Sequence, residues 1–453
     1  MRTSAALFFL ALSGCAGGGE PAAPEAKEIV IGQYGSLTGP EATFGISTKN
    51  GIELATEEVN TRGGIAGMKL RMVVEDDQGK PEETASAVSK ILSRDRPVAL
   101  LGEVASTLSL TAAPLAQNAG VPMISPSSTN PKVTEVGDYI FRVCFIDPFQ
   151  GTAIAKFAYN SKNVRKVAIL KDVKSDYSQG LGQFFAETFT KLGGTIVAEE
   201  AYAKGDLDFK AQLTKVIATG PEAIFIPGYY TDVGLIAKQA RQLNYTGLLL
   251  GGDGWDSVEL AKVGEDAIVG GFFTNHYSTD DPNPTVQDFI KRYQAKYGQK
   301  PDGLAALGYD AAKVLYSAIE GVAADPAMAA ALGDRSSTPA TEASRKKARE
   351  AIRDRLTHIA DFNGVTGSIT IDANRNAQKP AVVVEVLRDA GQYRFVEAVY
   401  PDGMTAPPAA PAGGTVEGGA TPGAPAPGGA GAAPAAPGAP AAPAAPAAPA
   451  GAH

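Results

Sequence analysis

Two groups of hydroxyl side chains follow consecutive apolar runs in the first third of the chain. Ser and Thr at 106–107 come after the run 98–101, and Ser, Ser and Thr at 127–129 come after the run 121–124. Short apolar runs predict buried strands, and open α/β sheets bind ligands at the carboxyl ends of their strands. Because helix N-termini at that edge favour an anion, the two groups together predict a site for a small carboxylate. Either group alone is more simply interpreted as helix caps and turns.

The second half of the chain offers an acid and aromatic rings at comparable positions. Asp253 lies in the Gly-rich segment 251–256, directly after the apolar run 248–250. Aromatic residues stand at this and two other predicted strand ends: Tyr177, Tyr229 and Trp255. A carboxylate pairs with an ammonium group, and aromatic faces add cation–π attraction. Combined with the carboxylate site, these residues predict a site for an α-amino acid. The alternative is a Gly-rich turn in which Asp253 only shapes the backbone.

Strands and helices are predicted to alternate along the chain, which indicates βαβ units with a parallel sheet and helices on both faces. In the first half we predict strands at 29–34, 70–74, 98–101 and 121–124, and helices at 45–60, 81–93 and between 106 and 120, the last kinked at Pro114. In the second half we predict strands at 166–171, 195–198, 223–227 and 247–250, and helices at 179–192, 209–218 and 232–243. Two longer runs, 139–146 and 270–277, predict crossings between the halves.

We therefore predict an α/β fold with two similar Rossmann-like lobes, whose parallel-rich sheets are joined by three hinge crossings. The core of roughly 375 residues is long enough for two domains. The first lobe is expected to comprise 28–143 and 275–360, and the second lobe 144–274 and 361–403. Within the first lobe, the polar stretch 324–345 is interpreted as an insertion or loop. Two lobes joined in this way enclose a cleft that closes by a hinge motion.

The two ends of the chain differ from this core in composition. Residues 1–14 are typical of a lipoprotein signal peptide, with cleavage before Cys15 and lipid on its sulfur. Residues 15–27 are interpreted as a tether. Residues 404–453 are almost only Ala, Pro and Gly, with Glu417 as the single charge. Such a segment has little to bury, so we predict a disordered tail.

The remaining composition argues against nucleic-acid binding and against catalysis. The net charge is −8 and no basic patch alternates with aromatics, so we expect no nucleic-acid partner. The three histidines, His276, His358 and His453, show no zinc-ligand spacing. There is no Gly-x-Ser-x-Gly elbow and no phosphate-binding loop. We therefore predict no metal, no cofactor and no catalytic residue, and we interpret the acidic run 75–77 as a solvated turn.

The chain also resembles a known family, the branched-chain amino-acid-binding proteins of bacterial ABC importers, of the leucine/isoleucine/valine type. The resemblance extends from 28 to about 399 and rests on the segments 31–40 (IGQYGSLTGP), 60–65 (NTRGGI), 75–77 (EDD), 122–131 (PMISPSSTNP), 228–229 (GY) and 308–311 (GYDA). It implies a type I periplasmic binding protein fold, a monomer without enzymatic activity, and ABC permease membrane subunits as partners.

The resemblance also implies ligand-binding roles for residues of both lobes: Ser106, Ser127, Thr129, Tyr177, Tyr229, Asp253 and Phe44. The hydroxyls of Ser106 and Thr129, with the backbone at Ser127, would hold the ligand's carboxylate and ammonium. The two tyrosines would close over the ligand, Asp253 would bind its ammonium, and Phe44 would lie beside its side chain. The chain departs from the family in having Asp253 where Glu is frequent, Ser127 where a small apolar residue is common, and no first-lobe disulfide.

Three functions follow from these observations. The first is a receptor of the periplasm or cell envelope, anchored through lipid on Cys15, which captures a branched-chain or aliphatic amino acid and delivers it to a permease. The second is a sensor lobe that binds an amino acid, an amide or urea and signals to a partner. The third is a surface hydrolase of α/β type, which would need a nucleophile beside a histidine.

Overall fold

The computed structural model describes residues 27–389, 392–401 and 403–404. The predicted signal peptide, Cys15, all of the tether except its last residue and all of the tail except its first residue lie outside these ranges. No helix among the described residues is both long and apolar enough to cross a membrane.

The first lobe is built on a five-stranded sheet with the order β2-β1-β3-β4-β5, in which every pairing is parallel. The strands are β1 Glu28–Gly35, β2 Lys69–Asp76, β3 Ala99–Leu101, β4 Met123–Ser125 and β5 Ile140–Arg142. The helices between them are α1 Ala42–Thr61, α2 Pro81–Lys90, α3 Ser106–Ala119 and α4 Lys132–Glu135, and α3 continues through Pro114. The carboxyl ends of β3 and β4 therefore deliver both groups of hydroxyl residues to one edge of the sheet, as predicted.

Helix α11 (Gly303–Ala323) packs along α1 in the core of this lobe. Glycines stand where the two backbones approach each other. A Cβ at Gly51 would overlap the carbonyl oxygen of Ala305, and one at Gly308 would overlap the carbonyl oxygen of Thr48. Since packed interiors leave no space for extra atoms, these glycines set the distance between the helices and hence the position of the N-terminus of α11 near the site.

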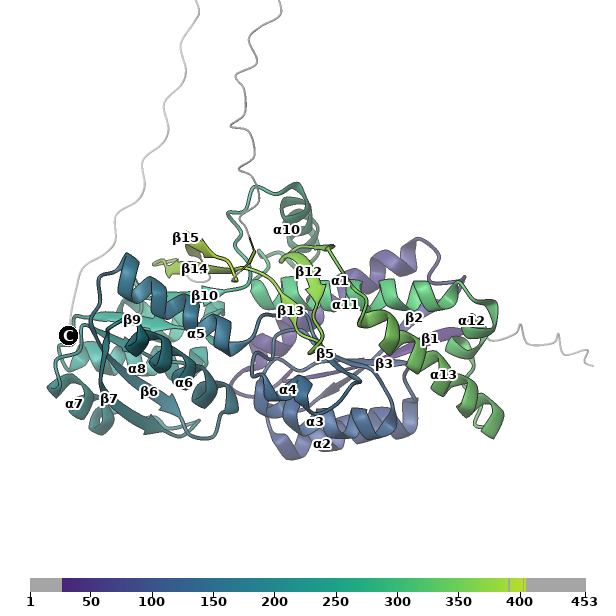
Figure 1. Cartoon of the computed structure of the whole chain (residues 1–453), viewed down its shortest axis with the longest axis horizontal. Coiled ribbons are helices and arrows are strands. Elements are labelled where there is room, and N and C mark those ends of the chain that lie inside the picture. Colours follow the sequence, from purple (N-terminus) through teal and green to yellow (C-terminus); the bar gives the residue numbers. More distant parts are fainter. Residues whose placement is uncertain (1–26, 390–391, 402, 405–453) are drawn as a thin grey trace, which may run out of the picture. The chain divides into compact units, whose positions relative to one another are not determined.

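The second lobe contains a seven-stranded sheet with the order β15-β14-β10-β9-β8-β6-β7 (Figure 1). Its strands are β6 Lys166–Asp172, β7 Thr195–Tyr202, β8 Ala223–Phe225, β9 Leu248–Gly251, β10 Phe272–Asn275, β14 Ala381–Val386 and β15 Tyr393–Val399. Strands β14 and β15 are antiparallel to their neighbours, and the others are parallel. The helices are α5 Asp147–Lys156, α6 Asp176–Lys191, α7 Lys210–Ala218, α8 Tyr230–Gln242 and α9 Val258–Gly264, with a 3-10 turn at Asp253–Trp255.

The described chain passes between the two sheets three times, after β5, after β10 and before β14. A small sheet, β11 Phe362–Gly364, β12 Gly367–Ile371 and β13 Ala377–Gln378, precedes the third crossing. Its Val365 and Ile369 belong to the same apolar cluster as α1 and α11. The predicted lobe boundary at 361 assigned this small sheet to the second lobe. Because it packs in the core of the first lobe, we propose that 362–378 belongs to the first lobe and that the third crossing lies at 379–380.

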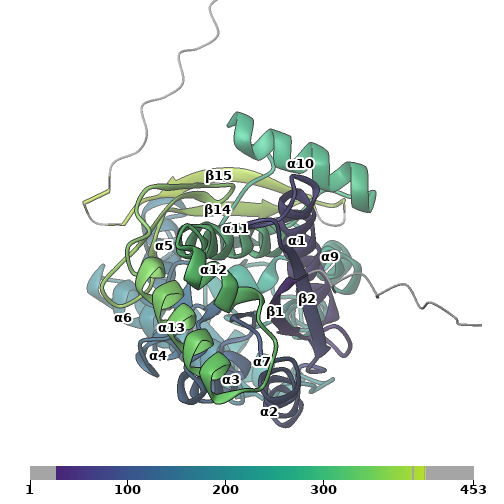
Figure 2. The same ribbon diagram turned by 90° about the vertical axis from the view of Figure 1, so that its right-hand side faces the viewer.

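The stretch 324–345 was predicted to be an insertion or a loop, and the loop alternative was wrong. This stretch contains α12 (Pro326–Gly333) and the start of α13 (Pro339–Leu356), both green in Figure 2. Each helix starts with proline after a residue whose side chain caps the first turn: Asp325 accepts from Ala327 N, and Thr338 accepts from Thr341 N. Proline is well tolerated at the first helical position. The prolines and polar residues that suggested a loop are therefore helix-start signals.

The acidic run 75–77 is also not simply the predicted solvated turn. Asp77 is fully buried, and Ser36 Oγ donates to its Oδ1 at 3.0 Å. Ser36 N and Oγ both donate to Glu103 Oε1 at 2.9 Å. Burial, together with neighbouring carboxyls, raises the pKa of Asp77 and raises that of Glu103 to about 8. These contacts hold the segment after β1 against the segment after β3, which leads into the site.

Candidate functional site

One pocket between the lobes is lined by seven of the eight predicted ligand-binding side chains. The first lobe contributes Phe44, Ser106, Ser127 and Thr129, and the second lobe contributes Tyr177, Tyr229 and Asp253. Val104, Gly254 and Leu304, which the sequence did not single out, complete the lining. About 240 Å³ of space not occupied by atoms lies in and around this pocket, part of it open to solvent. Residues separated by up to 260 positions in the chain, Phe44 and Leu304, thus form one site.

The wall from the first lobe carries hydrogen-bond donors. Ser106 is the first residue of α3, where backbone N–H groups lack intrahelical acceptors. Its Oγ accepts from Asn130 N at 3.2 Å, so its own O–H is left to donate toward the pocket. Ser127 Oγ is buried and has no hydrogen-bond partner among the described residues. This wall is suited to a carboxylate.

Arg142 holds the loop that carries this wall. It is fully buried at the end of β5 and donates to the carbonyl oxygens of Ser128, Asn130 (2.8 Å) and Pro131 (3.2 Å). Desolvation on burial lowers its pKa. Sequence reasoning missed this role, although Arg142 is the single charge within the apolar run that starts at Tyr139.

The wall from the second lobe carries the acid. Asp253 follows β9 and is 6% exposed. Gln150 Nε2 donates to its Oδ1 at 2.8 Å, and His276 Nε2 lies 3.0 Å from its Oδ2. Each carboxylate oxygen has a second lone pair that can face the pocket. The arrangement can receive an ammonium group opposite the donor wall.

Aromatic rings close the pocket between these walls. Tyr177 and Tyr229 are stacked with centroids 5.3 Å apart, and Phe44 meets Tyr229 edge-on at 5.5 Å. Tyr177 OH accepts from Gly254 N at 3.1 Å. Burial raises the pKa of both tyrosines well above the usual value, so their hydroxyls stay protonated and can donate.

Trp255 does not line this pocket, in contrast to the sequence prediction. Its indole is fully buried and donates from Nε1 to Ile226 O at 2.9 Å. The absent side chain of Gly251 makes room for the ring, since a Cβ there would overlap the indole. The structure places Trp255 in the core of the second lobe, where it supports the turn that carries Asp253.

The two lobes touch each other around the pocket. Thr107 Oγ1 donates to Asp176 Oδ2 at 2.9 Å, and Lys204 Nζ lies 2.8 Å from Glu41 Oε2. Tyr230 OH donates to the carbonyl oxygen of Pro40 at 2.7 Å. The structure therefore shows the lobes in a closed arrangement, with the lining side chains buried between them.

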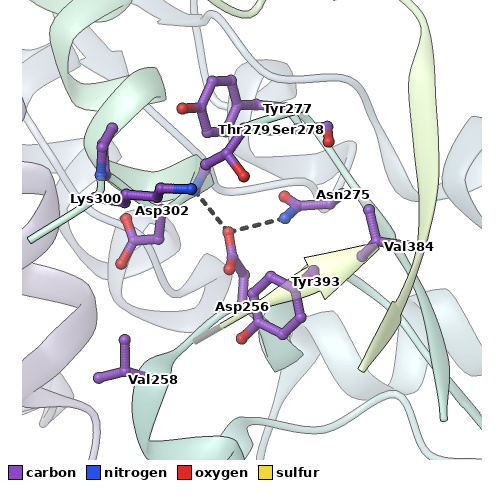
Figure 3. A pocket seen from close by; sticks show the side chains of 12 residues that line it. Asp256, Val258, Asn275, Tyr277, Ser278, Thr279, Lys300, Asp302, Val384 and Tyr393 are labelled. Carbon is purple, nitrogen blue, oxygen red and sulfur yellow. Dashed lines mark hydrogen bonds between the residues drawn. The ribbon is translucent and has the colours of Figure 1, made fainter. Parts of the chain in front are cut away.

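A second cavity lies beside the second crossing (Figure 3). There Asp256 Oδ2 accepts from Gly303 N at 2.6 Å and from Asn275 Nδ2 at 2.9 Å. Asp256 follows the turn that bears Asp253, and Gly303 starts α11 of the first lobe. This contact ties the lobes together. Burial and the nearby Asp302 carboxyl raise the pKa of Asp256 to about 7.

Replacing Gly303 with alanine is expected to weaken this contact between the lobes. The added Cβ would lie 2.6 Å from Asn275 Oδ1 and 2.7 Å from Asp256 Oδ2. Overpacking of this kind costs about 1–3 kcal/mol, so we expect roughly 5- to 150-fold weaker ligand binding, measured by calorimetry, if the whole cost falls on the closed arrangement. The matched control is Gly182→Ala in α6, whose Cβ would meet no atom closer than 3.6 Å. Equal affinity in the two variants would contradict the prediction.

The described residues offer little for catalysis or metal binding. They contain no group of three or more His, Cys, Asp or Glu side chains that could hold a metal ion. Neither Ser106 nor Ser127 is hydrogen-bonded to a described histidine, because His276 contacts Asp253 and His358 contacts the end of α13. A serine without a neighbouring base has no route to activation.

Comparisons with known proteins agree with this geometry. A family model described as periplasmic binding protein matches residues 28–392. The amino acid binding protein of Pseudomonas aeruginosa is 32% identical over 306 residues, which are 67% of this chain and 81% of that protein. The Leu/Ile/Val-binding protein homolog 3 of Brucella melitensis is 32% identical over 294 residues, which are 65% of this chain and 79% of that protein.

Two solved structures are similar over most of the chain. The leucine binding protein LivK of Thermotoga maritima is 38% identical, with a TM-score of 0.74, and the match covers 83% of this chain and 100% of that one. The branched-chain amino acid transporter substrate binding protein LivJ of Streptococcus pneumoniae, solved in complex with isoleucine, is 31% identical, with a TM-score of 0.73 and the same coverage.

Proposed function

This chain belongs to the periplasmic binding protein family and has its type I fold, and from that premise we propose that it captures an amino acid between its lobes and delivers it to an ABC permease. The observation that carries the proposal is the pair of opposed walls in one pocket. Hydroxyl and N–H donors come from the first lobe, and Asp253 comes from the second. An α-amino acid presents a carboxylate and an ammonium group on one carbon, so it can contact both walls at once.

The ligand we propose is a branched-chain or other aliphatic amino acid. The remaining lining is apolar and comes from Phe44, Val104 and Leu304. A hydrophobic side chain gains free energy by leaving water for such a surface. Relatives named for leucine, isoleucine and valine, and a similar structure solved with isoleucine, support this choice.

Closure of the lobes would strengthen the binding of both charged groups. Coulomb attraction between charges is larger where water is excluded, and the Asp253 carboxylate is already almost completely shielded from solvent. The ligand would thus bridge the lobes and favour the closed arrangement, because it makes both sets of contacts only there. We propose that the protein binds and releases the ligand without changing it chemically. It would then act without enzymatic activity and without a cofactor.

We further propose that the protein works as a monomer in the periplasm or cell envelope, held to a membrane by lipid on Cys15. The motif around Cys15 supports the anchor. Mass spectrometry of protein from membranes would show a diacylglyceryl mass on an N-terminal fragment that starts at Cys15.

Calorimetry with protein that begins after Cys15 tests the ligand. We expect leucine, isoleucine or valine to bind with a stoichiometry of about one and to raise the melting temperature, because a ligand that binds only the folded state stabilises it. If none of the amino acids binds, the proposal fails. Binding of urea or an amide instead would favour the sensor alternative.

A further inference from the structure

We propose that Gln150 and His276 are positioning residues that make this pocket selective for ligands with an amino group. The inference rests on the proposed function and adds to it the side chains that orient Asp253. Neither residue lines the pocket, and each contacts Asp253 with its side chain.

The geometry assigns one donor to each oxygen of the carboxylate. Gln150 Nε2 donates to Oδ1 at 2.8 Å, and His276 Nε2 is 3.0 Å from Oδ2. All three side chains are buried. With one partner on each oxygen, rotation of the carboxylate would break both contacts, and each oxygen keeps a lone pair for a ligand in the pocket. Such fixation matters for aspartate, because its single methylene leaves little reach toward an ammonium group.

The protonation state of His276 fits this role. Burial lowers its pKa, although the Asp253 carboxylate acts in the opposite direction. A neutral ring can donate from Nε2 and leaves Nδ1 bare, and Nδ1 has no hydrogen-bond partner among the described residues. A protonated ring would compete with the ligand's ammonium for the same carboxylate. Neutral His276 therefore leaves the negative charge of Asp253 to the ligand.

The surroundings of the ring contain other charges that a pH experiment must allow for. The ring stacks on Phe145 of the first crossing, with centroids 3.7 Å apart. Its charged neighbours are Asp253 itself and Lys379 of the third crossing. The pKa of the buried Asp147 carboxyl is raised well above its usual value by burial, and the Asp253 carboxylate raises it further. These groups are present in wild type and variants alike. A difference between the pH profiles of wild type and a His276 variant therefore reports on His276.

The pair also connects the ligand to the hinge. His276 directly follows β10 and so begins the second crossing, and Gln150 lies in the first turn of α5 at the end of the first crossing. The carboxylate that would receive the ammonium is therefore held by two of the segments that join the lobes. A ligand that lacks the amino group would not contact Asp253 and so would not be connected to these two crossings.

The experiment compares leucine with 4-methylpentanoate, which has the same side chain and carboxylate but no amino group. Affinities are measured by calorimetry, with displacement titration for the weaker ligand, for wild type, His276→Phe and Gln150→Met. His276→Phe keeps a ring to stack on Phe145 but cannot donate, and His358→Phe on the surface is the matched control. We expect each site variant to lose leucine affinity at least about 10-fold and to change 4-methylpentanoate affinity less than about 3-fold, because only the amino group uses Asp253.

A pH series from 5 to 8 supplies a second readout, and it uses His276→Gln, which keeps a donor but does not titrate. Leucine affinity of wild type should be constant above about pH 6.5, the ordinary pKa of histidine, and fall at lower pH as the ring takes up a proton. The profile of His276→Gln should be flatter. Equal losses for both ligands, together with identical pH profiles, would overturn the inference. If wild type binds no amino acid, the proposed function itself has failed.

Discussion

Replacing Asp253 with asparagine is expected to weaken leucine binding at least about 100-fold while the protein stays folded. The substitution keeps the size of the side chain but removes the negative charge that faces the ammonium group. Loss of one partner of a buried, hydrogen-bonded charge pair costs about 2–5 kcal/mol, and 100-fold corresponds to about 2.7 kcal/mol. Calorimetry gives the affinity, and thermal unfolding without ligand gives the stability of the variant.

The matched control for this variant is Asp310→Asn. Asp310 is a buried carboxylate of the first lobe that accepts from Val365 N and Thr366 N, both at 2.8 Å, and does not line the pocket. Its replacement should lower the melting temperature and leave leucine affinity within about 3-fold. Unchanged affinity of Asp253→Asn would remove Asp253 from the binding site and with it the opposed-wall arrangement.

Replacing Arg142 with methionine is expected to lower the free energy of unfolding by about 3–5 kcal/mol, the cost of breaking a fully buried charged network. The guanidinium satisfies three carbonyl oxygens of the loop 128–131. Methionine fills similar space but donates nothing, so these buried acceptors would lose their partners. Urea denaturation measures the change, and leucine affinity should fall as well, because Thr129 lies in the same loop.

Arg353→Met is the matched control. It shows how much stability is lost when an arginine that is not deeply buried is replaced by methionine. Arg353 lies on α13 at the surface and contacts the exposed carboxylate of Asp138 at 3.0 Å. Exposed ion pairs contribute only about 0–1 kcal/mol, so this variant should be nearly as stable as wild type. A similar small loss in both variants would show that Arg142 does not hold the loop.

Much of the site could be predicted because the local sequence shows where strands end, and the carboxyl ends of parallel strands lie at one edge of a sheet, where ligands bind. The hydroxyl groups at 106–107 and 127–129 stand after apolar runs, and strands of a parallel sheet end at a common edge. The same reasoning placed Asp253, Tyr177 and Tyr229 at strand ends of the second lobe. The position of Phe44 came from the family resemblance alone.

Trp255 and the stretch 324–345 show where local reasoning was insufficient. Trp255 is only two residues from Asp253 in sequence. A large apolar ring lowers the free energy more in a core than beside a polar pocket, and Gly251 leaves the space for it. In 324–345, prolines and polar residues are compatible with both a loop and helix starts. The apolar residues whose burial favours helices here, such as Ala331 and Leu332, belong to a cluster assembled from distant segments.

The sequence by itself determined the alternation of strands and helices, the two parallel-rich sheets and which residues stand at the strand ends, because periodicity and turn chemistry act over a few neighbouring residues. Only the tertiary structure decided that Gln150 and His276 hold Asp253, that Arg142 supports the opposite wall and that Asp256 meets Gly303 across the lobes. These pairs join different secondary-structure elements, with partners between 12 and 103 positions apart in the chain, and Asp256 and Gly303 also lie in different lobes. Their contacts depend on how whole lobes pack and close, which no local pattern of residues records.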